Sequence, residues 1–150
     1  MSRDNSRLAL AATIHCLTGC AIGEVLGMAL GAWLAWPNVA TIVISIVLAF
    51  FFGYGLTIRS LLAGGMTLRE TWRIALASDT LSIAVMEIVD NLFMLIVPGA
   101  MDAGIAQPRF WGALLSSLVL AGIVALPVNA WLIRQGRGHA LVHRGHHGHH

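Results

Sequence analysis

Four long apolar stretches, separated by short polar breaks, make up most of the chain. They cover residues 8–36, 39–58, 81–101 and 111–133. Each is close to the roughly 20 residues that a helix needs to cross a bilayer, and each largely lacks the polar face of a soluble amphipathic helix. The pattern predicts an all-α membrane protein with four transmembrane helices.

The break between the second and third stretches carries helix signals of its own. Gly64 and Gly65 interrupt the second helix, and Thr67 and Glu70 have the spacing of a capping box. We therefore expect a short interfacial helix after Thr67, lying at the membrane surface. The Ser-Asp-Thr segment at 78–80 would then cap a separate third span.

Composition and charge agree with a membrane domain over residues 1–135. Hydrophobic residues make up 57% of the chain and charged residues 11%, and the mean hydropathy is +0.79. The chain has no lysine, and of its nine arginines only Arg109 falls on the far side of a four-span topology. The positive-inside rule then places both termini in the cytoplasm, which we expect to be that of a bacterial cell with the protein in its inner membrane. Arginines that flank membrane spans contact lipid, so nucleic acid is not an expected partner.

The first stretch also contains a pattern typical of a bacterial lipoprotein signal, with Cys20 as the lipidated residue after Leu17, Thr18 and Gly19. The apolar run continues for sixteen residues past Cys20. A mature lipoprotein would not need that continuation. We therefore expect an uncleaved membrane span.

Chemically active side chains lie on one face of the first stretch. At 3.6 residues per turn, residues four apart share a face. One such row contains Cys16, Cys20, Glu24 and Met28. The adjacent row contains Gly19, Gly23, Gly27 and Gly31, with His15 at its cytoplasmic end. Small residues at this spacing let another helix approach closely, so the glycine row predicts helix packing and a homo-oligomer.

The third stretch repeats the polar row. Its residues four apart are Ser82, Met86, Asp90 and Met94, and a neighbouring row contains Asp79, Glu87 and Asn91. The first and third spans run in the same direction, so counting from their cytoplasmic ends matches their depths. The count pairs Cys16 with Ser82, Cys20 with Met86, Glu24 with Asp90, and Met28 with Met94.

These rows indicate function because ionisable groups in a membrane are costly. Each one at the centre of a helix costs about 2.5 to 3.5 kcal/mol on insertion scales. Thiols and thioethers favour soft ions, above all copper as Cu(I). We therefore expect the protein to bind or transport Cu(I) with the ligands Cys16, Cys20, Met28, Met86, Met94 and His15. Glu24, Glu87, Asp90 and Asn91 would compensate charge or handle protons.

Several other interpretations stay open. The carboxyl groups could be the working groups of a proton- or cation-coupled transporter, with the sulfur atoms only packing. The polar rows could instead bind the helix of a partner, as in a membrane subunit or an assembly factor. A thiol oxidoreductase is disfavoured because cysteines four apart on one helix are poorly placed for a disulfide. The chain has no Cys-x-x-Cys, Walker, nucleotide-binding or hydrolase motif, so we do not expect an enzyme.

The tail, residues 136–150, contains six of the seven histidines. It is too polar and too rich in glycine to pack, and we expect it to be disordered on the cytoplasmic side. His139 and His143, four residues apart, could form an accessory metal site. A remnant of an expression tag is the alternative.

Three segments together carry a resemblance to a known family. They are HCLTGCAIGE, ASDTLSIAVMEIVDN and LPVNAWLIRQGRGHALVH, and they extend from His15 to His143. They resemble a family of small four-span bacterial membrane proteins known only as a domain of unknown function. The resemblance implies a polytopic membrane fold and transfers no activity, substrate or ligand.

Overall fold

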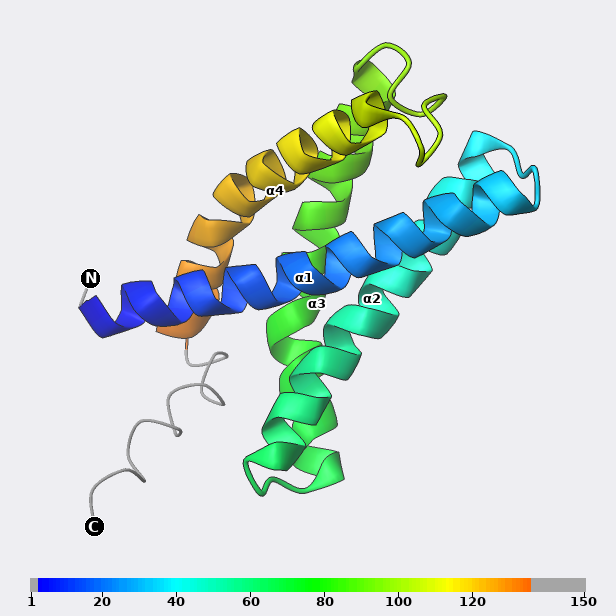
Figure 1. Ribbon diagram of the computed structural model, residues 1–150. Helices are drawn as coiled ribbons and strands as arrows, with labels where there is room; N and C mark the ends of the chain where they lie inside the picture. Colours follow the sequence, from blue (N-terminus) through cyan, green and yellow to red (C-terminus); the bar gives the residue numbers. More distant parts are fainter. Residues whose placement is uncertain (1–2, 136–150) are drawn as a thin grey trace.

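The computed structural model describes residues 3–135, and the side chains of residues 5–135, as an all-α protein (Figure 1). Its helices are α1 (Arg3–Trp33), α2 (Asn38–Ala63), α3 (Leu68–Ile96) and α4 (Pro108–Arg134). The predicted disordered tail, with His139 and His143, lies outside the described residues.

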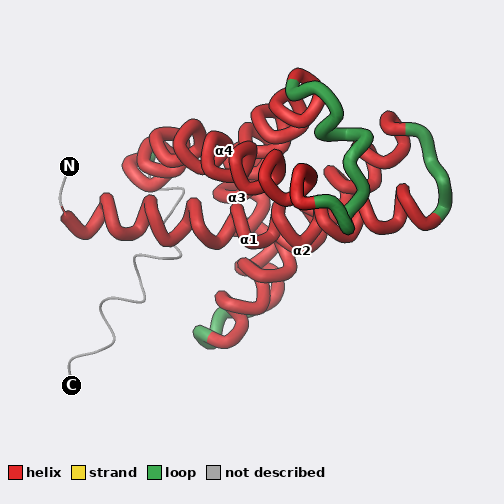
Figure 2. The backbone as a smooth tube through the Cα atoms, turned by 45° about the horizontal axis from the view of Figure 1, so that its top comes forward, coloured by secondary structure: helices red, strands yellow, loops and turns green. Residues whose placement is uncertain are grey.

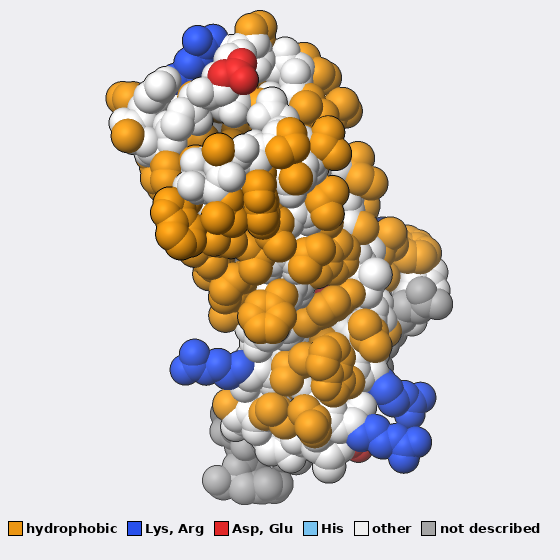
Figure 3. Space-filling view, turned by 90° about the vertical axis from the view of Figure 1, so that its right-hand side faces the viewer, with side chains coloured by type: hydrophobic (Ala, Val, Ile, Leu, Met, Phe, Trp, Pro, Cys, Tyr) orange, Lys and Arg blue, Asp and Glu red, His pale blue; other side chains and the backbone are white. Residues whose placement is uncertain are grey.

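Three of the helices are long and apolar enough to cross a membrane: α2, α4 and α1 from Asn5 onward. Large apolar side chains cover much of the surface, and arginine side chains lie toward the two ends of the face in Figure 3. The third helix is long enough but less apolar than the others. Every 18-residue segment of α3 contains at least three charged residues, which is unusual for a span that contacts lipid. The structure thus supports a membrane protein with three clear candidate spans.

The segment after Thr67 is one continuous helix. The capping box is present: the Glu70 backbone N–H donates to Thr67 Oγ1 at 3.4 Å, and the Thr67 backbone N–H donates to Glu70 Oε2 at 3.2 Å. The prediction of a separate interfacial helix was wrong. Ser78 and Thr80 do not cap a new helix, because their hydroxyl groups donate back to the carbonyls four residues earlier in α3.

The four helices form two arms that meet near the loops joining α1 to α2 and α3 to α4 (Figures 1 and 2). One arm contains the N-terminal part of α1 and the C-terminal part of α4, and the other contains the ends of α2 and α3 that meet at their turn. The N-terminal end of α1 and the C-terminal end of α4 lie together on one side (Figures 1 and 2). The turn between α2 and α3 lies apart from them. The helix α1 packs extensively against α2, and it also contacts α3 and α4. Because α1 contacts all three other helices, it joins the two arms.

The glycine row of α1 is the surface that contacts α2. A methyl group placed on Gly23 would lie 2.2 Å from the backbone nitrogen of Ala49, and one on Gly27 would lie 2.1 Å from Ser45 Oγ. Gly19 and Gly31 face Gly53 and Thr41 in the same way. The glycines therefore pack helices, but within one chain. Because α2 covers this face, the expected homo-oligomer stays a prediction that would have to use another surface.

The matching face of α2 was not recognised in the sequence. Its buried residues include one small residue per turn: Thr41, Ser45, Ala49 and Gly53. Each of them lies opposite one of the glycines of α1. Close packing here depends on small residues on both helices.

Candidate functional site

The acid- and sulfur-bearing rows of α1 and α3 face each other in the interior. The Cys16 thiol lies close to the Ser82 side chain, and the carboxyl groups of Glu24 and Asp90 lie close to each other. The other two pairs share apolar clusters. Cys20 and Met86 belong to one cluster, and Met28 packs against a second cluster that contains Met94. The register obtained by counting residues is confirmed for the first two pairs, and the shared clusters agree with it for the others.

Glu87 lies beside the Cys20 thiol, one turn below the Glu24 and Asp90 pair. Its carboxyl group is close enough to that thiol to interact with it electrostatically. Asn91 donates to Glu87 Oε2 at 3.3 Å and to the Glu87 carbonyl at 2.9 Å. The two polar rows predicted on α3 thus contribute to one interior cluster, which we call the acid cluster: Glu24, Glu87, Asp90 and Asn91.

The fourth helix adds a hydroxyl group that the sequence did not single out. Ser117 of α4 is fully buried, and its hydroxyl group hydrogen-bonds to Asp90 Oδ1 and to the Leu114 carbonyl. A serine pair at 116–117 in an otherwise apolar segment was the available signal. That signal could not indicate which of the two hydroxyls points inward.

A second polar group lies nearer the arginine-rich ends of α1 and α3. The buried carboxyl group of Asp79 lies 2.7 Å from Ser78 Oγ, whose single hydroxyl proton is shared with the Ile74 carbonyl, and it lies close to Thr57 and His15. His15 is partly buried. His15 thus lies at the N-terminal end of the polar residues that α1 directs toward α3.

Buried polar atoms without a hydrogen-bond partner concentrate at this interface. Among the described residues, seven such side-chain atoms occur, and six of them belong to His15, Glu24, Asp79, Ser82, Glu87 and Asp90. Ser82 Oγ has only the weak Cys16 thiol beside it. The few polar atoms that a protein leaves unpaired in its interior require an explanation. Here they follow one path between two helices.

The same residues do not form a compact metal centre. Within residues 3–135, no three His, Cys, Asp or Glu side chains converge on a position that could hold a metal ion. The sulfur atoms divide between two clusters, because Cys20 and Met28 are eight residues apart, or about 12 Å along the helix axis. Both cysteines are buried and free. The candidate ligands therefore form a file and not one coordination sphere.

Comparison with known proteins identifies the family. The domain of unknown function DUF4396 matches residues 6–138. The chain belongs to this family. No curated protein and no solved structure matches it. In this DUF4396 protein, the matched region includes nearly all of the four helices and every residue of the acid cluster. The resemblance noted in the sequence is thereby confirmed at the level of the family.

Proposed function

We propose that the protein carries protons, alone or in exchange for a cation, along the interface between α1 and α3. The observation that supports this function best is that Glu24 and Asp90 are buried close to each other, each with a carboxyl oxygen that lacks a hydrogen-bond partner. The side chains are 3% and 1% exposed, so water cannot solvate them as it would on a surface. The electrostatic influences on Glu24 come from Asp90 and Glu87, which are both acids. A proton between the two carboxyl groups satisfies both of them.

The surroundings of the pair favour a proton or a small cation. Ser117 has one hydroxyl proton and two acceptors, Asp90 Oδ1 and the Leu114 carbonyl. Glu24 Oε2 and Asp90 Oδ2 have no other donor among the described residues. An additional proton would supply a donor to the unpaired carboxyl oxygens and leave the Ser117 hydroxyl proton free for one acceptor. We infer that the acid cluster binds and releases protons during transport.

The remaining unpaired atoms extend the route toward one end of the helices. Asp79 and Glu87 are eight residues apart on α3, about 12 Å along its axis, and a proton cannot cross that distance in one step. Ser82, with its unpaired hydroxyl, lies between them. The proposed order is His15 and Asp79, then Cys16 and Ser82, then Glu87 and Cys20, and finally Glu24 and Asp90.

The proposal includes α3 as a fourth membrane span. Its acids face α1 and α4, while Leu81, Ile88 and Leu92 are exposed on its outer side and would contact lipid. The arginine distribution supports a topology with both termini, and the turn between α2 and α3, in the cytoplasm. Cysteine labelling tests this topology. A cysteine at Met66 should react with a membrane-impermeant maleimide only from the cytoplasmic side.

Proton flux into liposomes tests the function. We expect purified protein to acidify vesicles containing a pH-sensitive dye when a potassium diffusion potential drives protons inward. The variants E24Q and D90N should fall to the rate of protein-free vesicles, whereas E24D keeps a carboxyl group and should retain part of the flux. Wild-type flux in D90N would contradict the proposal.

A soft-metal carrier, the expected copper function, is the second candidate. One observation favours it: Cys16, Cys20 and Met86 belong to the same buried cluster. Elemental analysis of protein purified from copper-supplemented cells, with the histidine-rich tail removed, separates the candidates. Copper that disappears in C16S/C20S supports the metal function, and proton flux that survives in C16S/C20S but not in D90N supports the acid route. A defined partner that co-purifies, with neither metal nor flux, would support a membrane subunit instead.

A further inference from the structure

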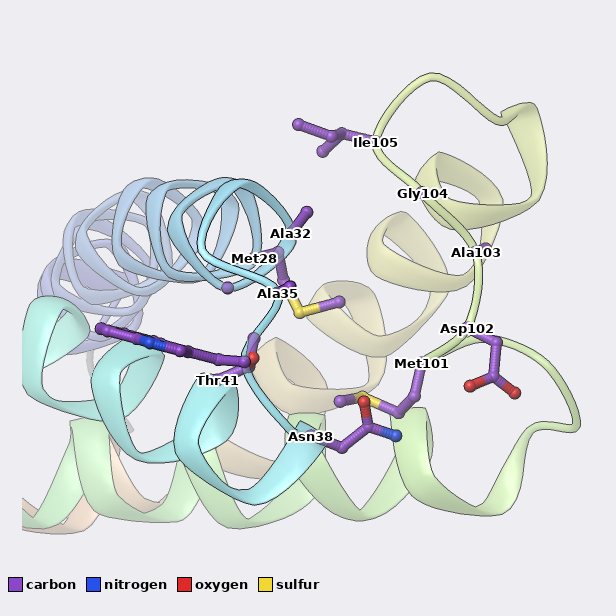
Figure 4. A pocket seen from close by; sticks show the side chains of 12 residues that line it. Met28, Ala32, Ala35, Asn38, Thr41, Met101, Asp102, Ala103, Gly104 and Ile105 are labelled. Atoms are coloured by element: carbon purple, nitrogen blue, oxygen red, sulfur yellow. The ribbon is translucent and has the colours of Figure 1, made fainter.

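A pocket of about 280 Å³ opens at the end of the protein opposite the turn between α2 and α3. It lies between the loop joining α1 to α2 and the loop joining α3 to α4 (Figure 4). Its lining includes Met28, Asn38, Thr41, Met101, Asp102 and Ile105. Figure 4 shows that the side chains of Met28 and Met101 point into the same space.

The pocket is bordered by a concentration of thioethers. Met28 and Met101 line it, and both pack against the apolar cluster that contains the buried Met94. Three of the six methionines of the chain therefore meet at this end. A methionine cluster can simply fill an apolar gap. Here, however, two of the three side chains face an open cavity instead of closing it.

The lining contains oxygen donors that a cation can use, one of them the carboxylate of the exposed Asp102. Asp102 is the one acidic or basic residue among the lining residues, and Asn38 adds a carboxamide oxygen. Thioether sulfur is a neutral, soft donor that prefers monovalent ions such as Cu(I) and Ag(I) over hard divalent ions. It carries no proton to lose, so its affinity for a metal does not depend on pH in the way that thiolate or imidazole affinity does.

We propose that this pocket captures a soft monovalent cation through Met28 and Met101, with Met94 behind them. The binding site stands on the pocket's own residues. Its role as the entrance to the proton route on the side away from the cytoplasm rests on the proposed function. Met28 lies one helical turn from Glu24 on the same row of α1. A cation bound at Met28 would be next to the paired carboxyl groups of the acid cluster.

Binding of Ag(I) tests the pocket. The titration uses the full chain in detergent and chloride-free buffer at about pH 5, where free imidazole is largely protonated and competes weakly for the metal. The C16S/C20S background removes the thiols. In that background we expect M28L/M101L to bind Ag(I) at least about tenfold more weakly. The control M66L should bind as the background does, because Met66 lies in the turn between α2 and α3, away from the pocket.

The outcomes separate the pocket from the transport route. Equal Ag(I) affinity in M28L/M101L and M66L would overturn the pocket proposal. The single variant M101L, at a partly exposed loop position, gives the same test if the double variant does not fold. Full Ag(I) binding in D90N, together with loss of its proton flux, would support both proposals. Weak Ag(I) binding in M28L/M101L with normal metal-free flux would support the pocket without any bearing on the acid cluster.

Discussion

Asn129 of α4 donates a hydrogen bond to Thr13 Oγ1 of α1 at 2.8 Å, and the Thr13 hydroxyl donates in turn to the Ala9 carbonyl at 2.8 Å. Both side chains are 3% exposed. This bond joins residues 116 positions apart in the chain. It fixes the end of α4 to the beginning of α1 below the acid cluster.

Removing one partner of this bond should destabilise the protein. N129A leaves Thr13 without its donor, and T13V leaves the buried carboxamide without its acceptor, each at a cost of about 1–3 kcal/mol. Unfolding in mixed detergent micelles measures the effect. The double variant T13V/N129A should cost less than the sum of the single variants, because it leaves neither partner of the bond unpaired. Strict additivity would show that the bond does not contribute.

The close approach of α1 and α2 predicts a strong effect of a single methyl group. G23A would place Cβ 2.2 Å from the backbone of Ala49, so the helices must separate, at a cost of roughly 1–3 kcal/mol. The control is G112A in α4, where nothing lies within 4 Å of the added methyl group. Since alanine favours helix over glycine, G112A should be neutral or stabilising by up to about 1 kcal/mol. The same unfolding assay compares the two variants, and equal stability would contradict the observed packing.

Ser117 should matter to the acid cluster while its neighbour does not. S117A removes a hydrogen bond to Asp90, and we expect a loss of about 1 kcal/mol of stability together with reduced proton flux. The matched control is S116A, whose exposed hydroxyl group donates only to the Gly112 carbonyl of its own helix at 2.8 Å. Equal flux in the two variants would place Ser117 outside the proton route.

The capping box at the start of α3 predicts a pH dependence. Thr67 donates to the Glu70 carboxylate through its hydroxyl at 2.7 Å and through its backbone N–H, and these bonds lower the pKa of Glu70 below its ordinary value of 4.5. The stabilisation is therefore complete above about pH 4.5 and disappears as the pH falls through the lowered pKa of the folded state.

Carbon-detected NMR of the Glu70 carboxyl group measures that pKa directly. T67A should return it toward 4.5. The difference in unfolding free energy between wild type and E70Q should shrink as the pH falls below about 4.5, because the wild-type carboxylate is then protonated. A Glu70 pKa that does not change in T67A would mean that the cap does not persist in solution.

Helical spacing alone was sufficient to predict which residues of α1 and α3 share a depth. Cys16 meets Ser82 and Glu24 meets Asp90, as counting indicated, because the rise and turn of a helix are nearly constant. The capping box was predictable for the same reason, since it depends on residues three apart. The separate interfacial helix was not, because the hydroxyl groups of Ser78 and Thr80 have two possible uses, and bonding within a continuous helix satisfies them.

The sequence by itself therefore determined the all-α fold, the spacing of acids, thiols and thioethers along α1 and α3, and the row of glycines. Only the tertiary structure decided what each face meets. It placed the glycines against Thr41, Ser45, Ala49 and Gly53 of α2, and it brought Ser117 and Asn129 of α4 to Asp90 and Thr13. The reason is physical. Periodicity within a helix follows from local backbone geometry, whereas the choice of partner is a competition among all faces of the chain for close packing and hydrogen bonds.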